Sequence, residues 1–113
     1  MNKDAVSRAH LAGSRLLVLE FVAHRFKAVS NRRGQVVGVV HLYEVRSADG
    51  WAPTVQKWCP KEIQTVEAAE KLDGCVLKVG QKIVVQFQYV AADRFDARNG
   101  TMIRAESVTP LES

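Results

Sequence analysis

Basic and aromatic residues stand close together at several places along this chain, a combination suited to a polymer that carries both negative charge and flat rings. Arginine and lysine neutralise phosphates, whereas aromatic rings stack on unpaired bases at about 1 to 3 kcal/mol each. If such side chains meet on one face of the fold, we expect them to bind single-stranded nucleic acid. The candidate residues are Arg32, Arg33, His41, Tyr43, Lys57, Trp58, Arg94, Phe95 and Arg98.

Each candidate also has an ordinary structural interpretation, and the sequence leaves both open. His41 and Tyr43 share one face of a strand with Val37, Val39 and Val45, so a place in the barrel interior or at an interface is as consistent with the sequence as binding of nucleic acid. The tryptophan that precedes the helix could fill the barrel's end, and the paired arginines could belong to a solvated turn. The phenylalanine of the charged arm has the least structural reason to be where it is.

Catalytic and metal-binding signatures are missing from the sequence. No glycine-rich phosphate loop precedes a helix, which argues against nucleotide hydrolysis. A thiolate dyad of Cys59 with His41 would lack an orienting third group. We therefore expect no enzyme, no cofactor and no zinc site. The histidines and cysteines considered, none at paired ligand spacing, are His10, His24, His41, Cys59 and Cys75.

Length and composition predict one globular domain. The chain has 113 residues, 47% of them hydrophobic and 25% charged, with a net charge of +4, which is compatible with a phosphate-binding face. No run approaches 18 apolar residues, and the two separated cysteines indicate reduced thiols. We expect a cytoplasmic protein with a flexible leader over residues 1–13 and a folded domain over residues 14–113.

Apolar runs separated by glycine-containing turns predict an opening β-hairpin. Arg15 to Lys27 is rich in Leu, Val and Phe and forms the first expected strand. Ser30 to Gln35 is a turn in which Gly34 supplies a positive φ, and Val36 to Val45 is a second, β-branched strand. Gly38 inside that strand predicts a bulge or bend.

A helix and a second hairpin follow. A third strand is expected over Trp51 to Trp58, with an irregular start because it contains a proline. Pro60 suits the first helical position, so the pattern predicts a helix over Lys61 to Leu72 that ends at the Asp-Gly pair after it. Val79 to Leu111 contains two strands joined by a long basic tip with an Asn-Gly turn. The apolar face expected for the helix is Ile63, Val66, Ala69 and Leu72.

Alternation along the strands assigns further side chains. Phe87 and Tyr89 alternate with glutamines and are expected to face the core. Val18, Val37 and Val39 are the apolar outer positions that we expect to contact other subunits.

The fold class follows from the order of these elements. Three strands, a helix and two more strands is the order of the OB-fold, a five-stranded partly open barrel that binds oligonucleotides across its second and third strands and the adjoining loops. SH3-like barrels and PilZ-type domains have similar strand counts. The helix between strands three and four favours the OB-fold, and we predict an all-β barrel with one helix.

Several segments also resemble a known family. The bacterial single-stranded DNA-binding proteins open in a way similar to SRLLVLEFVAHR, a basic turn closing on Gly34, and VVGVVHL. Their last two strands, above all in the short primosomal members, are similar to VGQKIVVQFQY, RNG and IRAESVTPL. The likeness spans Ser14 to Leu111. The chain departs from the family in its third strand, WAPTVQKWCP, and an acidic-tipped tail of the family's kind is not expected.

Residues and resemblance together predict a non-enzymatic protein that binds single-stranded DNA with little sequence preference. The resemblance implies work in DNA replication, restart or mobile-element propagation, with replication proteins as further partners and RNA as a competing ligand. One small barrel covers few nucleotides, so we expect a homodimer or homotetramer. The rival hypotheses are a non-enzymatic β-barrel adaptor that docks a protein and a small-ligand or immunity-type barrel.

Overall fold

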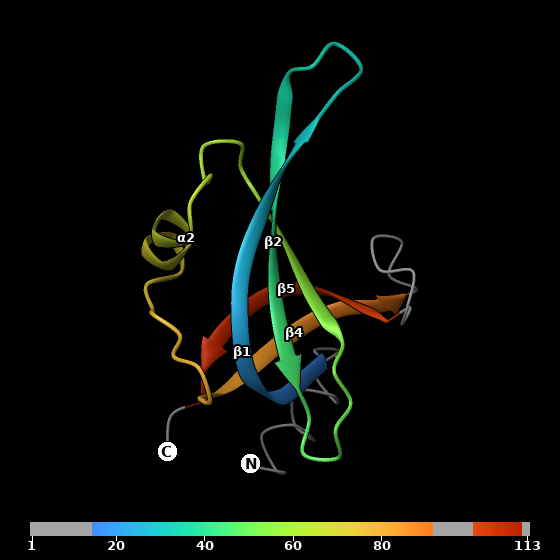
Figure 1. Ribbon diagram of the computed structural model, residues 1–113, viewed down its shortest axis with the longest axis vertical. Helices are drawn as coiled ribbons and strands as arrows, with labels where there is room; N and C mark the ends of the chain where they lie inside the picture. Colours follow the sequence, from blue (N-terminus) through green and yellow to red (C-terminus); the bar gives the residue numbers. More distant parts are fainter. Residues whose placement is uncertain (1–14, 92–100, 112–113) are drawn as a thin grey trace.

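The computed structural model describes residues 15–91 and 101–111. Figure 1 shows the elements in these two ranges, which confirm the predicted order of strands and helix. No helix in these ranges is long and apolar enough to cross a membrane. The expected leader lies outside the described residues. The elements are β1 (Arg15–Ser30), β2 (Val36–Arg46), β3 (Thr54–Cys59), α2 (Val66–Asp73), β4 (Lys82–Ala91) and β5 (Met102–Pro110).

The strands close into a barrel in the order β1-β2-β3-β5-β4. Neighbours pair antiparallel except β3 and β5, which run parallel over Thr54 to Gln56. β1 closes the ring because Arg15 to Glu20 pair with β4, whereas the strand pairs with β2 from Glu20 to Ser30. The register shifts between Phe21 and Ala23, so the bulge falls where the strand bends from one partner to the other.

The β1–β2 hairpin continues past the barrel as a two-stranded arm, residues 28–38, which projects at the top of Figure 1. Gly34 closes its turn with a φ of 78°, which is the positive φ predicted for it. The shift from the Val29–Gly38 pair to the Ser30–Val36 pair leaves one extra residue beside Gly38. This bulge confirms the irregularity predicted at that glycine.

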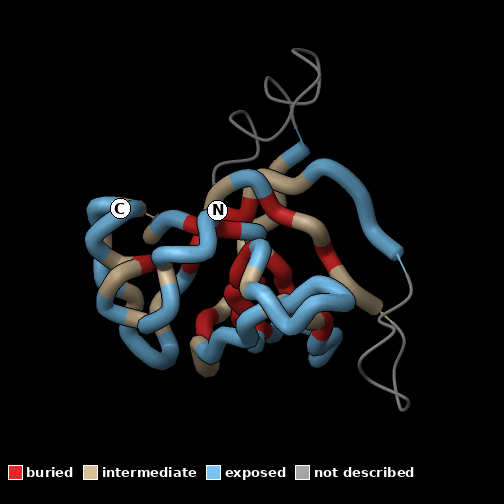
Figure 2. The backbone as a smooth tube through the Cα atoms, turned by 90° about the horizontal axis from the view of Figure 1, so that it is seen from above, coloured by how far each residue is buried: buried red, intermediate tan, exposed pale blue. Residues whose placement is uncertain are grey.

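The core lies inside the barrel, where the inward side chains of all five strands meet (the buried segments in the middle of Figure 2). Each large apolar side chain buried here contributes about 1.5 to 3 kcal/mol to folding. Its buried members are Leu19, Phe21, Tyr43, Val45, Val55, Ile83, Val85, Ile103, Ala105 and Val108.

Helix α2 begins later than the sequence predicts. Pro60 indicated a start at the next residue, but residues 60–63 form only a hydrogen-bonded turn. The helix is capped instead by Thr65, whose Oγ1 accepts a hydrogen bond from the Ala68 N–H at 2.9 Å. A capping hydroxyl satisfies an otherwise unpaired N–H, whereas proline only lacks one, so the cap decides the start. The predicted end is confirmed, since Gly74 is a left-handed C-cap with a φ of 73°.

Three side-chain assignments made from the sequence are wrong. Tyr89 is exposed, because the register shift between Phe87 and Tyr89 turns it out of the core. Leu72 is exposed because the short helix buries only Ala69 fully. Val39 is fully buried and cannot contact another subunit as an outer residue.

Candidate nucleic-acid interface

The outer face of the barrel carries side chains that alternate with the core residues. On β2, Tyr43 belongs to the core, so Val40 and Leu42 point to the opposite, outer face. Both are covered there by neighbouring side chains and are only 2% and 9% exposed. The pairing of β2 with β3 places Trp58 beside Val40 and Gln56 beside Leu42. The outer face of β2 and β3 is the surface with which OB-folds bind oligonucleotides.

Two further strands extend this face. On β5, Arg104 pairs in register with Gln56, and on β4 Tyr89 pairs with Arg104. Paired residues point to the same side of a sheet, so Gln56, Arg104 and Tyr89 form a row across β3, β5 and β4. Gln56 is buried, whereas Trp58, two residues further along β3, is on the same face and exposed. We name Trp58, Tyr89 and Arg104 the outer-face patch.

Trp58 is the larger of the two aromatic side chains in this patch. Its side chain remains 43% exposed. A Cβ built on Gly38 would lie 3.5 Å from two carbons of the six-membered indole ring, so the ring packs against β2 at this glycine. On β5, the Cζ of Arg104 lies over the indole, 4.9 Å from its centroid, which is within cation–π range.

Basic side chains flank the patch on β1. Arg25 and Lys27 are exposed and pair with Leu42 and Val40, so they lie on the same outer face. Arg25 forms an ion pair with Glu44 at 3.8 Å, and both side chains are largely exposed. Such surface pairs are worth about 0 to 1 kcal/mol, so Arg25 can exchange Glu44 for a phosphate at little cost.

Arg32 and Arg33 lie at the tip of the arm. Asn31 builds this turn, since its Oδ1 accepts hydrogen bonds from the N–H groups of Arg33 and Gln35 at 2.9 and 3.0 Å. Both arginines are exposed. Gly38, which lies against Trp58, is five steps along the chain from Arg33, so the arm holds the two residues at most about 17 Å apart.

His41 and Tyr43 are not on this surface. Their side chains are 0% and 1% exposed, because they alternate with Val40 and Leu42 and point into the barrel. No base can stack on either ring while the barrel is intact. The candidate set is corrected by removing both residues.

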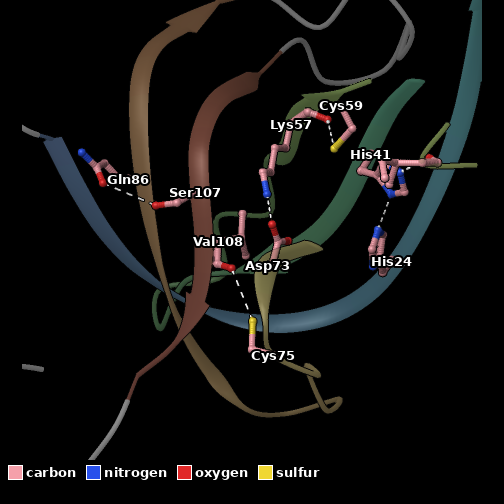
Figure 3. Close-up of polar contacts among 10 residues, drawn as sticks. His24, His41, Lys57, Cys59, Asp73, Cys75, Gln86, Ser107 and Val108 are labelled. Atoms are coloured by element: carbon pink, nitrogen blue, oxygen red, sulfur yellow. Dashed lines mark hydrogen bonds and ion pairs between the residues drawn. The ribbon is translucent and has the colours of Figure 1, made fainter. Parts of the chain in front are cut away.

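Lys57 is also turned away from the outer face. Its ammonium group forms an ion pair with the carboxylate of Asp73 in α2, and the two side chains are only 12% and 14% exposed (Figure 3). On β3 it alternates with Trp58, so it faces the helix rather than solvent. This correction assigns Lys57 to holding α2 against the barrel and not to a phosphate.

A pair of histidines lies at the same end of the barrel (Figure 3). The Ile63 carbonyl can only accept, so His41 donates to it through Nε2 at 2.8 Å. The Nδ1 of His41 and the Nε2 of His24 form a second hydrogen bond, also at 2.8 Å. His24 stacks on Tyr43 with 4.3 Å between ring centroids. The chain of contacts links the loop before α2 to β1 and β2.

Burial perturbs the titration of this end of the barrel. Burial, followed by the neighbouring His41, lowers the pKa of His24 to about 4. Burial likewise raises the pKa of the Tyr43 hydroxyl and of the Cys59 and Cys75 thiols. The thiols are therefore protonated at neutral pH and poor nucleophiles. No group of three or more potential metal ligands occurs in the described ranges.

The predicted tip residues Arg94, Phe95 and Arg98 lie outside the described residues. Of the nine candidates, the structure thus places Trp58 on the outer face and two arginines on the arm. Arg104 was not among the predicted site residues, and Tyr89 was predicted to face the core. Strict alternation along β4 puts Tyr89 on the same side as Phe87, and only the register shift between these two residues turns it to the outer face.

Comparisons with known proteins address the fold. No protein-family model matches the chain, and no curated protein matches it. The structure is similar to the solution NMR structure of the second OB-fold domain of replication protein A from Methanococcus maripaludis. The TM-score is 0.56 at 19% sequence identity, over 88% of this chain and 85% of that domain. At this identity the likeness concerns the fold, and it confirms the predicted OB-fold.

Proposed function

We propose that this protein binds single-stranded DNA with little sequence preference, through the outer face of its OB-fold barrel. The observation that carries the proposal is the partly exposed indole of Trp58 on the face of β2 and β3, with exposed basic residues on the neighbouring strand and arm. Bases stack on aromatic rings whatever their identity, because every base has a π-face. Sequence-tolerant binding follows.

Binding sequesters the single-stranded DNA and involves no covalent chemistry. A base stacks on Trp58 while Arg25, Arg32 and Arg33 neutralise the backbone on either side. The predicted tip residues Arg94, Phe95 and Arg98 stay in this proposal as further contacts. Since about 4 to 16 nucleotides bind per OB-fold, the arm and the patch lie within the reach of one short segment.

The cellular setting belongs to the same proposal. The similar solved domain comes from a replication protein, which supports a role in DNA replication. The sequence resemblance to bacterial single-stranded DNA-binding proteins, and to primosomal replication protein B in particular, supports restart or mobile-element propagation in the cytoplasm. We include assembly into a homodimer or homotetramer, because linked barrels bind one strand more tightly than a single barrel.

Fluorescence anisotropy with a labelled oligo-dT tests this function. Trp58→Ala removes the stacking platform and should raise Kd by about 5- to 100-fold, the equivalent of 1 to 3 kcal/mol. Trp51→Ala is the matched control, since Trp51 lies in the loop before β3 and not on the patch, and should change Kd less than 2-fold. Absence of binding by the wild-type protein at low salt, or equal losses in both variants, would contradict the proposal.

A protein-docking adaptor is the second candidate. Val76 and Val79, in the segment after α2, are strongly exposed, Val79 at 78%, and exposed apolar side chains are typical of docking surfaces. The two functions differ in salt response. DNA binding weakens steeply as salt rises, whereas an apolar docking surface is nearly indifferent to salt. An adaptor would leave oligo-dT unbound while Val79→Asp abolished partner capture.

A further inference from the structure

Arg104 has an unmet hydrogen-bond donor. Its Nη1 is buried and has no hydrogen-bond partner among the described residues. No carboxylate within those ranges forms an ion pair with it either. Glu106, two residues along β5, already accepts a hydrogen bond from the Gln88 amide at 3.2 Å. Buried donors without partners are rare and costly, so this guanidinium gains by moving to an acceptor.

The same guanidinium partly occupies the ring that the proposed function needs. The Cζ of Arg104 lies over the Trp58 indole at 4.9 Å from the centroid. A base that stacks on this part of the ring must displace the guanidinium, because both need the same π-face. The displaced guanidinium would remain on the outer face of β5, beside the phosphates of the bound DNA.

We propose that Arg104 leaves the Trp58 ring for a backbone phosphate when single-stranded DNA binds, so that a base takes its place on the indole. The inference rests on the proposed function and adds a residue and an order of events to it. Each group exchanges a weaker partner for a stronger one. The buried N–H acquires a phosphate oxygen in a charge-assisted hydrogen bond, and the indole acquires a base in place of a cation.

The exchange predicts two opposing effects of Arg104 on DNA affinity. Its phosphate contact strengthens binding and is weakened by salt, whereas its contact with the indole competes with the incoming base. One lost phosphate contact changes the slope of log K against log salt by about 0.7, so the ratio of Arg104→Ala to wild-type affinity should rise about 5-fold over a tenfold rise in salt. Removing a cation–π contact shifts an equilibrium by about 2- to 5-fold. At high salt, where the phosphate contact is screened, Arg104→Ala should therefore bind as tightly as wild type or up to 5-fold more tightly.

The experiment measures oligo-dT affinity by anisotropy for wild type, Arg104→Ala, Trp58→Ala and the double variant, across a tenfold range of salt. With alanine at position 58 there is no indole to uncover, so Arg104→Ala should weaken binding at low salt and bring no gain at high salt. Arg104→Lys keeps the charge without the planar stack and should retain the wild-type salt slope, which preserves the test if Arg104→Ala folds poorly.

A second readout follows the ring itself. In a Trp51→Phe background Trp58 is the remaining tryptophan of the two in the chain, and Arg104→Ala should make its emission more accessible to acrylamide in the free protein. Equal losses of affinity for Arg104→Ala at all salt concentrations would overturn the exchange, since Arg104 would then stay on the ring as a fixed part of the platform. Failure of wild type to bind oligo-dT would instead overturn the proposed function.

Discussion

Lys57 offers the sharpest separation between a structural and a DNA-binding role. Its ion pair with Asp73 joins β3 to the end of α2, and both side chains are nearly buried. Removing one partner of a buried pair costs about 3 to 5 kcal/mol, because the other charge is left without compensation. The small remaining exposure lets water reach the pair, so we expect Lys57→Met to lower the free energy of unfolding by about 2 to 3 kcal/mol.

Urea denaturation followed by circular dichroism measures this loss, and in a thermal scan it corresponds to a decrease in Tm of roughly 10 °C for a domain of this size. Lys61→Met is the matched control, the same change at an exposed position, and should cost less than about 0.5 kcal/mol. Replacing both partners, with Lys57→Met and Asp73→Leu, should recover most of the stability. The salt slope of DNA binding should stay at its wild-type value in Lys57→Met. A stable variant with a flatter slope would mean that Lys57 contacts a phosphate after all.

Three further predictions concern other parts of the molecule. Because the pKa of His24 is about 4 when folded and about 6.5 when unfolded, its contribution to stability is complete above pH 6.5 and is lost as the pH falls towards 4. Urea denaturation at pH 7 and at pH 4.5 measures this loss. Between the two pH values the free energy of unfolding should fall by about 1 to 2 kcal/mol more in wild type than in His24→Gln, after allowance for solvent screening of a half-buried group. Equal losses in the two proteins would contradict the perturbed pKa. Thr65→Ala should lower the free energy of unfolding by about 1 kcal/mol through loss of the cap on Ala68, with Thr65→Ser near wild type and DNA affinity unchanged in both. Gly38→Ala should keep the oligo-dT affinity, since its Cβ would meet the indole at an ordinary contact distance of 3.5 Å. The extra carbons of Gly38→Val should displace Trp58 and weaken binding at least 5-fold. Equal affinities of these two variants would show that the position of the indole does not matter for binding.

Local signals predicted most of the fold. Gly34 and Gly74 have the positive φ that their turn and cap require, and the apolar runs between the turns became strands in the predicted order. The start of the helix was mispredicted because Pro60 and Thr65 both mark helix starts, and only the hydrogen bond to Ala68 decides between them.

The candidate site was less predictable because its decisive contacts join distant parts of the chain. β2 is apolar on both faces, so alternation could not say that His41 points inward. The partner of Lys57 lies sixteen residues away, at the end of a helix. Arg104 meets Trp58 only because β3 and β5 pair in parallel to close the barrel, a pairing that no local pattern specifies.

One titration tests the proposed binding face most directly. Oligo-dT is added to the Trp51→Phe protein at several salt concentrations while the emission of Trp58 is followed. Stacking on the indole predicts quenching on binding, and neutralisation of three to five phosphates predicts a slope of log K against log salt of about −2 to −3.5. Binding without any change in Trp58 emission, or a slope near zero, would contradict a DNA interface on the outer face of β2 and β3.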